Sequence, residues 1–327
     1  MTGLFDSIRS GAQRVAQAAT SVRIDPERLE RFALEVGREA AGPVQHDPAH
    51  HRLASEVETL AYIVTLDAIN FGSGWFPLLR KRQGCSGYFT IATALKERFE
   101  RDGAFSAKQL RNLDTRDCCR LFGQDVTNGE VAELMAKFAT SLNDLGQFLE
   151  TGYGGSFESW AEAGAHSAER LALSLTEMPF FRDVSRYVPE GDGDGFDVPL
   201  YKRAQLTCAD LATAFGGERF GRLDDLDQLT IFADNLVPHV LRCEGVLTYR
   251  DDLAESIDAE QRIEAGSREE IEIRAVCLHA VEGMVDVLRA AGNVDATAQR
   301  LDYLLWNRGQ APSIKARPRH RARSVFY

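Results

Sequence analysis

Lysine is scarce in this chain of 327 residues: only six of its 38 basic side chains are Lys. Because Arg supplies the ordinary surface charge, a Lys is more informative than usual, since its compact ammonium group shifts its pKa readily when buried. Cysteine is also scarce, with six residues and no CxxC pair. This pattern predicts reduced core thiols in a cytoplasmic protein and excludes a disulfide-stapled domain.

Motifs of several common enzyme classes are missing. The sequence contains no Walker A loop, no G-x-S-x-G elbow and no dinucleotide-binding glycine pattern. Its seven His show no metal-ligand spacing with Cys, Asp or Glu, so we expect chemistry without a metal or another cofactor. No apolar run approaches the roughly 18 residues that span a bilayer, and no signal-peptide pattern opens the chain, so no membrane partner is expected.

The charge balance is acidic, with a net charge of −11 spread along the chain. A protein that binds nucleic acid duplexes needs a basic face, so direct duplex binding is not expected. An acidic surface suits a small, cationic substrate. Hydrophobic residues make up 44% of the chain, which is ordinary for a globular protein with a large core.

Helix start signals recur and predict an all-α or nearly all-α fold. Capping boxes begin at Ser55, Ser106, Thr127 and Ser267, and Asp25-Pro26 opens a further helix. The two longest apolar stripes at helical spacing are Val131, Leu134, Met135, Phe138, Leu142, Leu145 and Leu149, and then Ile271, Val276, Leu278, Val281, Val285 and Leu288.

No Gly/Ser-rich or Pro-rich linker divides the chain. We therefore expect one globular helical domain over residues 1–327. The best place for a break into two lobes is the acidic, Gly-rich loop at residues 188–197.

Asp234 is a lone acid in an apolar context, between the run at 229–233 and Leu236-Val237. A carboxylate is expensive to desolvate there, so it is paired, catalytic or capping a helix. Asp is a favoured N-cap, and Pro238 follows closely. One residue can fill both the capping and the catalytic role.

Pro199 fits the first position of a helix whose first turn contains Tyr201, Lys202 and Arg203. The helix dipole disfavours a cation there unless an anion offsets it. Lys202 is therefore either a solvated surface residue or part of an anion site.

Asp67 and Asn70 share one face at the end of a predicted helix, followed by Phe71 and Trp75. A carboxylate and an amide beside two aromatic rings can bind a flat heterocycle, through its edge and its faces. The competing interpretation is a helix end with buried aromatic side chains. His51, in the pair His50-His51, is a further polar candidate.

Six motifs occur in this order along the chain: Asp67-Ala-Ile-Asn70-Phe71, Phe181-Arg182-Asp183-Val184, Tyr201-Lys202-Arg203-Ala204-Gln205, Phe232-Ala233-Asp234-x-x-x-Pro238, Glu270-Ile271-Glu272-Ile273-Arg274 and Leu301-Asp302-Tyr303-Leu304-Leu305-Trp306. Together they resemble the queuosine salvage protein family, from about residue 25 to the C-terminus.

The resemblance implies a helical fold similar to that of helix-hairpin-helix DNA glycosylases. It also implies hydrolysis of queuosine 5′-monophosphate to queuine and ribose 5-phosphate, with queuosine itself as a related ligand. By position, Asp234 would be the catalytic carboxylate and Lys202 its companion. The resulting candidates for substrate binding are Asp67, Asn70, Phe71, Trp75, Tyr201, Arg203, His51, Asp302 and Trp306.

Two other classes of function compete with this enzyme. A helical scaffold or binding protein would use Asp234 only as a cap and Phe71 only in the core. A nucleic-acid glycosylase would need a basic face and a Gly-rich turn where Phe196-Asp197-Val198-Pro199 stands. Whether Lys202 contacts the substrate phosphate or pairs with Asp234 stays open at this point.

Overall fold

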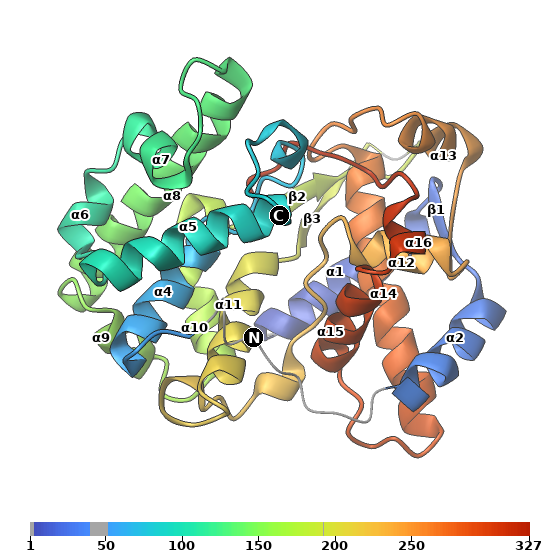
Figure 1. The fold of residues 1–327 in the computed structure, drawn as a ribbon. Helices are drawn as coiled ribbons and strands as arrows, with labels where there is room; N and C mark the ends of the chain where they lie inside the picture. Colours follow the sequence, from blue (N-terminus) through green and yellow to red (C-terminus); the bar gives the residue numbers. More distant parts are fainter. Residues whose placement is uncertain (1–2, 40–51, 192) are drawn as a thin grey trace. The chain divides into compact units, whose positions relative to one another are not determined.

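The computed structural model describes residues 3–39, 52–191 and 193–327, which divide into two compact units (Figure 1). Unit 1 comprises the described residues of Met1–Val44, Asp183–Lys202 and Asp227–Ala322. Unit 2 comprises those of Gln45–Arg182, Arg203–Leu226 and Arg323–Tyr327. The predicted, mainly helical fold is confirmed, and each unit is assembled from segments that are distant in the sequence.

The described residues of unit 1 contain seven α-helices, four short strands and the first residue of one further helix. They are α1 (Leu4–Ala18), β1 (Val22–Ile24), α2 (Pro26–Glu39), β2 (Val184–Tyr187), β3 (Phe196–Pro199), the first residue of α11 (Lys202–Ala214), α12 (Val237–Cys243), β4 (Leu247–Tyr249), α13 (Asp251–Asp258), α14 (Arg268–Ala290), α15 (Ala298–Arg308) and α16 (Pro312–Lys315). Asp227 and Gln228 of the 3-10 helix η4 (Leu226–Gln228) also belong to this unit.

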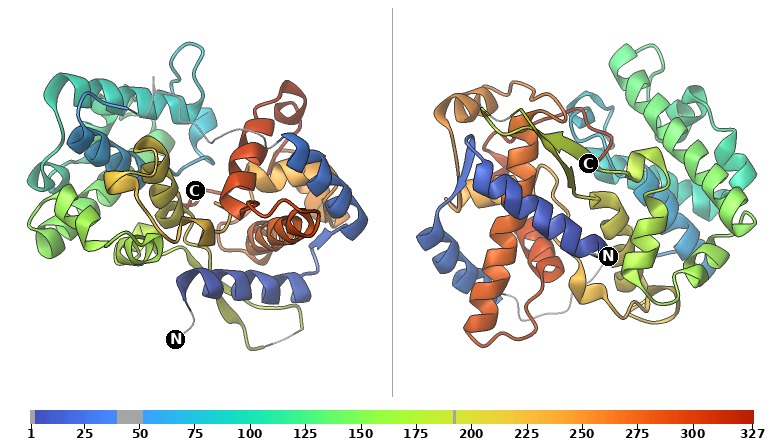
Figure 2. Two further views of the ribbon diagram at one scale, coloured as in Figure 1. Left: turned by 90° about the horizontal axis from the view of Figure 1, so that it is seen from below. Right: turned by 180° about the vertical axis from the view of Figure 1, so that it is seen from behind.

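Helix α14 is the centre of unit 1. It packs against α1, α2, α12 and α15, and α1 crosses it on the face shown in the right-hand view of Figure 2. Ser267 caps its first turn by accepting the Glu270 N–H, as the sequence predicts. The predicted apolar stripe is buried, but so are Glu270, Glu272 and Arg274. These three buried charges were not expected from an amphipathic pattern.

The strands form two antiparallel pairs. β1 pairs with β4, and β2 pairs with β3 in a register that places Val184 opposite Pro199. Both β2 and β3 belong to unit 1, and the described residues between them are 188–191 and 193–195. Pro199 is therefore the last residue of a strand, where a missing N–H is tolerated.

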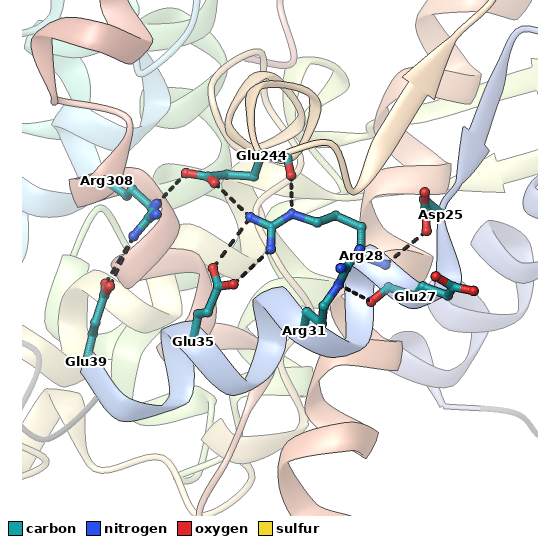
Figure 3. Close-up of polar contacts among 8 residues, drawn as sticks. All are labelled: Asp25, Glu27, Arg28, Arg31, Glu35, Glu39, Glu244 and Arg308. Atoms are coloured by element: carbon teal, nitrogen blue, oxygen red, sulfur yellow. Dashed lines mark hydrogen bonds and ion pairs between the residues drawn. The ribbon is translucent and has the colours of Figure 1, made fainter.

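An ion-pair network joins α2 to the end of α12 and to α15 (Figure 3). Arg28 binds Glu35, on its own helix, and Glu244, which follows α12. Arg308 on α15 binds the same Glu244 and also Glu39 on α2. Single surface pairs contribute little, but a shared carboxylate makes this a network that ties α15 to its neighbours.

The described regular elements of unit 2 are all α-helices or 3-10 helices. They are α4 (Glu56–Ala68), η1 (Phe76–Leu78), α5 (Gly87–Asp102), α6 (Ala107–Arg111), α7 (Thr115–Phe122), α8 (Gly129–Tyr153), α9 (Phe157–Ala163), α10 (Ala168–Leu175), η2 (Pro179–Phe181), α11 from Arg203 onward and η3 (Arg219–Gly221).

Helix α8 organises unit 2, and its predicted apolar stripe is buried. It packs against α4, α6, α7 and α9. Gly146 permits the close approach of α6, because a Cβ at this position would overlap the backbone of Ala107. The predicted cap was wrong by one residue: Asn128, not Thr127, caps the helix by accepting the Val131 N–H. Thr127 instead bonds to Asp125.

No helix within residues 3–39, 52–191 and 193–327 is long and apolar enough to cross a membrane.

Candidate functional site

Asp234 lies in a stretch that is neither helix nor strand, between η4 and α12. Its neighbours Ile231, Phe232, Ala233 and Asn235 are buried, whereas Asp234 itself is only half-buried. The chain therefore holds one accessible carboxylate inside an otherwise buried run.

The carboxylate binds the start of α12 from two residues before Leu236, which is the N-cap residue of this helix. Oδ1 of Asp234 accepts the backbone N–H of Leu236 over 2.7 Å and that of Val237 over 3.1 Å. Among the described residues, Oδ2 accepts no hydrogen bond. One oxygen thus orients the side chain, and the other can face a ligand.

Two buried charged side chains hold the backbone that leads into Asp234. Oδ1 of Asp302, on α15, accepts the Phe232 N–H over 2.9 Å. Nε of Arg274, on α14, donates to the carbonyl oxygen of Ala233 over 2.9 Å. Because no sheet or helix bonds fix this stretch, these contacts and the bonds to the start of α12 determine where Asp234 lies.

The electrostatics around this stretch disfavour a thiolate. Burial raises the pKa of the Cys277 thiol well above its usual range, and the charges of Asp234 and Asp302 raise it further. Cys277 therefore stays a neutral thiol at neutral pH and is no nucleophile. Burial lowers the pKa of Arg319, whereas the charge of Asp234 raises it, so this arginine is a cation of the same region.

Lys202 begins α11, and the predicted helix start at Pro199 was wrong by three residues. The hairpin of β2 and β3 extends through Pro199, which pairs with Val184 across the strands. Tyr201 then adopts a left-handed backbone with φ 45°. The Lys202 N–H donates to Oδ2 of Asp183 over 3.2 Å, and its side chain is only 7% exposed.

The anion at the start of α11 is therefore Asp183. A carboxylate there satisfies a helix N–H and interacts well with the helix dipole. It also offsets the charge of a lysine in the first turn.

The predicted residues Asp67 and Asn70 lie in unit 2, where α4 ends at Ala68. Asn70 lies beyond the end of the helix, so the two residues do not share a helix face as predicted, but their side chains meet: Nδ2 of Asn70 donates to Oδ1 of Asp67 over 3.5 Å. Asp67 is 1% exposed, whereas Asn70 is half-buried.

The aromatic rings that follow are packed inside unit 2. Phe71 is 1% exposed and meets Phe138 and Phe180 edge to face, at centroid distances of 5.1 and 5.8 Å. Trp75 is fully buried, and its Nε1 donates to Glu133 over 3.2 Å. In this structure both rings contribute to the core.

The buried side chain of Arg203 connects backbone segments of unit 2. Its guanidinium group donates to the backbone carbonyls of Asp67, Ala68, Phe180 and Val325. It also lies over the rings of Phe71 and Phe181, at 4.8 and 4.5 Å from their centroids. These contacts use its donors to join the end of α4, η2 and the C-terminal segment.

Trp306 follows Asp302 by one turn of α15, so the two share a helix face in unit 1. Trp306 is half-buried, unlike the rings of unit 2. His51 lies outside the described residues. The predicted site residues thus fall into one group in unit 1, with Tyr201, Lys202, Asp234, Asp302 and Trp306, and a second group in unit 2.

A separate hollow of about 420 Å³ lies on unit 1 between α1 and α14. Polar side chains, including Arg9, His279 and Glu282, line it, but none of the predicted site residues does. In the part of the chain that the structure describes, no group of three or more His, Cys, Asp or Glu could hold a metal ion.

Prediction from sequence missed the roles of Asp183, Arg274 and Arg319. Asp183 and Arg274 belong to motifs of the resemblance, but nothing in the sequence showed that they meet. One signal was present: Glu270 and Arg274 are one turn apart within a buried apolar run, where opposite charges must be paired.

Comparison with known proteins agrees with the resemblance. The model of the family described as queuosine salvage protein matches residues 49–327. The chain is 32% identical over 320 residues to the Queuosine 5′-phosphate N-glycosylase/hydrolase of Sphaerobacter thermophilus, and the match covers 96% of each chain. Proteins of the same name from Dictyostelium discoideum and Mus musculus are 32% and 27% identical, over 82% and 98% of this chain and 78% and 98% of the relatives.

Proposed function

The chain belongs to the queuosine salvage protein family, and from this premise we propose that it hydrolyses the N-glycosidic bond of queuosine 5′-monophosphate, releasing queuine and ribose 5-phosphate. The names of its relatives support this substrate and this reaction. The structural observation that carries the proposal is Asp234: an accessible carboxylate in a buried run, oriented through one oxygen only.

The proposed role of Asp234 is to stabilise the sugar. Cleavage of an N-glycosidic bond leaves positive charge on the ribose in an oxocarbenium-like transition state. A carboxylate fixed beside the ring stabilises this charge and can activate the attacking water. Because the bonds to the start of α12 hold Oδ1, Oδ2 is the oxygen that we assign to the sugar or the water.

The leaving group needs help from hydrogen bonds. Queuine is a 7-deazaguanine, so it lacks the ring nitrogen that a purine glycosidase can protonate. Its departure must be assisted at its other polar edges, and its cationic secondary amine suits acidic surroundings. We assign Trp306 to stacking on the base, because it is the half-buried ring next to Asp302 on α15. The assignment of Asp67, Asn70, Phe71 and Trp75 to the base stays a prediction.

We assign the side chain of Lys202 to the 5′-phosphate. Nη1 and Nη2 of Arg203 already donate to backbone carbonyls, so they support no such role. The first N–H of α11 is bound to Asp183, so the charge for the phosphate must come from a side chain.

Three finer points belong to the same proposal. We propose that the fold is related to helix-hairpin-helix DNA glycosylases, which is supported by a lysine that starts one helix and an aspartate that binds the start of the next. The net charge of −11 supports a free nucleotide as substrate in preference to a nucleic acid duplex. The free cysteines suit the reducing environment of the cytoplasm.

Incubation with queuosine 5′-monophosphate, followed by chromatography for free queuine, tests the reaction. Parallel incubation with queuosine and with a queuosine-containing tRNA separates a nucleotide hydrolase from an enzyme that acts on nucleic acid. If queuine is released only from the tRNA, and not from the nucleotide or nucleoside, the protein is an enzyme that acts on nucleic acid. A scaffold protein would release queuine from none of the three.

A further inference from the structure

Two of the family motifs meet in a buried ion pair that has no role in the reaction described so far. Nη1 of Arg274 donates to Oδ1 of Asp183 over 3.0 Å, and Nη2 donates to Oδ2 over 2.6 Å. The side chains are 1% and 2% exposed. Arg274 lies in the N-terminal third of α14, and Asp183 lies directly before β2.

Stability alone is a poor explanation for this pair. Desolvating two charges is costly, and apolar residues of similar volume often replace a buried ion pair without loss of stability. Glu270, one turn before Arg274, lies 3.6 Å away and adds a second buried carboxylate. The arrangement therefore points to a function that needs directional contacts.

The arginine side of the pair leads to Asp234. The third nitrogen of the guanidinium group, Nε, donates to the carbonyl oxygen of Ala233, the residue before Asp234. This stretch has no helix or strand bonds of its own. A planar guanidinium group holds its donors in a fixed fork, so it fixes the carbonyl relative to the carboxylate that it binds.

The aspartate side of the pair leads to Lys202. Oδ2 of Asp183 accepts the Lys202 N–H, and its backbone oxygen accepts the N–H groups of Leu200 and Tyr201. Tyr201 has a left-handed backbone, which a non-glycine residue keeps only when its surroundings hold it. Asp183 thus holds the whole turn that ends in Lys202.

We propose that Arg274 and Asp183 are positioning residues that set the backbone of Asp234 relative to the backbone of Lys202. This inference rests on the function proposed above, in which those two side chains act on the sugar and the phosphate. The two segments are about thirty residues apart in the sequence, and one ion pair contacts both. A displacement of about 1 Å at a reacting group can cost about 100-fold in rate.

The test is Arg274→Lys. It keeps the positive charge but loses the paired bonds to Asp183 and the bond to Ala233. The kcat for queuine release from queuosine 5′-monophosphate is expected to fall about 100-fold. KM is expected to change by less than about threefold, because the loss concerns the transition state more than ground-state binding. Asp183→Asn is expected to show the same pattern, because it loses the charge that pairs with Arg274. Its amide oxygen can still accept the Lys202 N–H, so the turn before α11 is kept.

Glu272→Gln is the matched control. Glu272 is buried two residues before Arg274, and it accepts the N–H groups of Ser21 and Val22 and the hydroxyl of Tyr187. None of these partners adjoins Asp234 or Lys202 in the sequence. The variant is expected to melt at a lower temperature and to keep its kcat at temperatures where circular dichroism shows it folded.

The outcomes separate the two proposals. If the wild-type protein releases no queuine, the proposed function fails. If it releases queuine and Arg274→Lys and Asp183→Asn lose no more kcat than Glu272→Gln, only the positioning role is overturned. Failure of both variants to fold would also overturn it, because the pair would then be needed for folding itself. A folded Arg274→Lys with low kcat and unchanged KM supports it.

Discussion

Oδ1 of Asp234 accepts the backbone N–H of Leu236 over 2.7 Å, so the proposed catalytic carboxylate also binds the start of the helix that follows it. Asp234→Asn keeps an oxygen that can accept this bond, whereas Asp234→Ala removes it. Both variants are expected to lose at least about 100-fold in turnover, because both lose the negative charge. Only the alanine variant is expected to lose stability as well, by about 1 kcal/mol.

Thermal melts and single-turnover rates of the two variants check this prediction. An asparagine variant that turns over normally would refute the catalytic role. An asparagine variant that is as unstable as the alanine variant would refute the assignment of the helix-start bonds to Oδ1.

Lys202→Ala separates two roles of the lysine. If the ammonium group binds the 5′-phosphate, the variant should lose far more kcat/KM with queuosine 5′-monophosphate than with queuosine. The preference of the wild-type protein for the nucleotide should also shrink as salt rises, because much of it would be Coulombic. Equal losses with both substrates and a shifted pH–rate profile would instead mean that Lys202 acts on Asp234.

The aromatic residues are expected to divide by their environment. Phe71→Ala should lower the free energy of unfolding by about 3–5 kcal/mol, because the ring is buried against Phe138 and Phe180. Trp306→Ala should change stability less and weaken queuine binding by about 1–3 kcal/mol. Urea denaturation and titration with queuine measure the two quantities. If a folded Phe71→Ala binds queuine more weakly and Trp306→Ala binds it unchanged, the base stacks on Phe71 and not on Trp306.

The pH dependence of stability is expected to include a contribution from His320. Burial, together with the nearby charge of Arg274, lowers its pKa to about 3. The unfolded chain therefore binds a proton below about pH 6.5 that the folded protein excludes, and stability falls as pH falls. Protonation of this histidine in the unfolded chain should lower the free energy of unfolding by about 1.4 kcal/mol for each pH unit below that value.

Denaturation at pH 7 and pH 5.5 measures this contribution. His320→Asn should flatten the pH dependence, whereas His166→Asn, which changes an exposed histidine, should leave it intact. Parallel slopes in the wild-type protein and His320→Asn would contradict the assignment.

Short sequence patterns correctly predicted helix caps and the buried faces of the long helices. Ser106 and Ser267 cap their helices as the spacing of Glu or Gln predicts, and the apolar stripe of α8 is buried along its length. Asp234 was identified for the same reason, since an acid inside an apolar run needs a partner. The acid and the family motif that contains it are both readable in the sequence.

Long-range contacts decided where those patterns failed. Pro199 looked like a helix start, but its pairing with Val184 extends the hairpin through it. The contact of Asp183 with Arg274 joins residues 91 positions apart, and no local signal encodes it. Phe71 fits either stacking on a ligand or core packing by its type, and only its neighbours in three dimensions distinguish the two.

The central claim is that this chain cleaves queuosine 5′-monophosphate through the carboxylate of Asp234. The most direct measurement is the amount of free queuine formed from that nucleotide by equal concentrations of folded wild-type protein and Asp234→Asn. The account predicts stoichiometric release of queuine and ribose 5-phosphate by the wild-type protein and at least about 100-fold slower release by the variant. Equal rates in the two proteins, or no release by either, would contradict it.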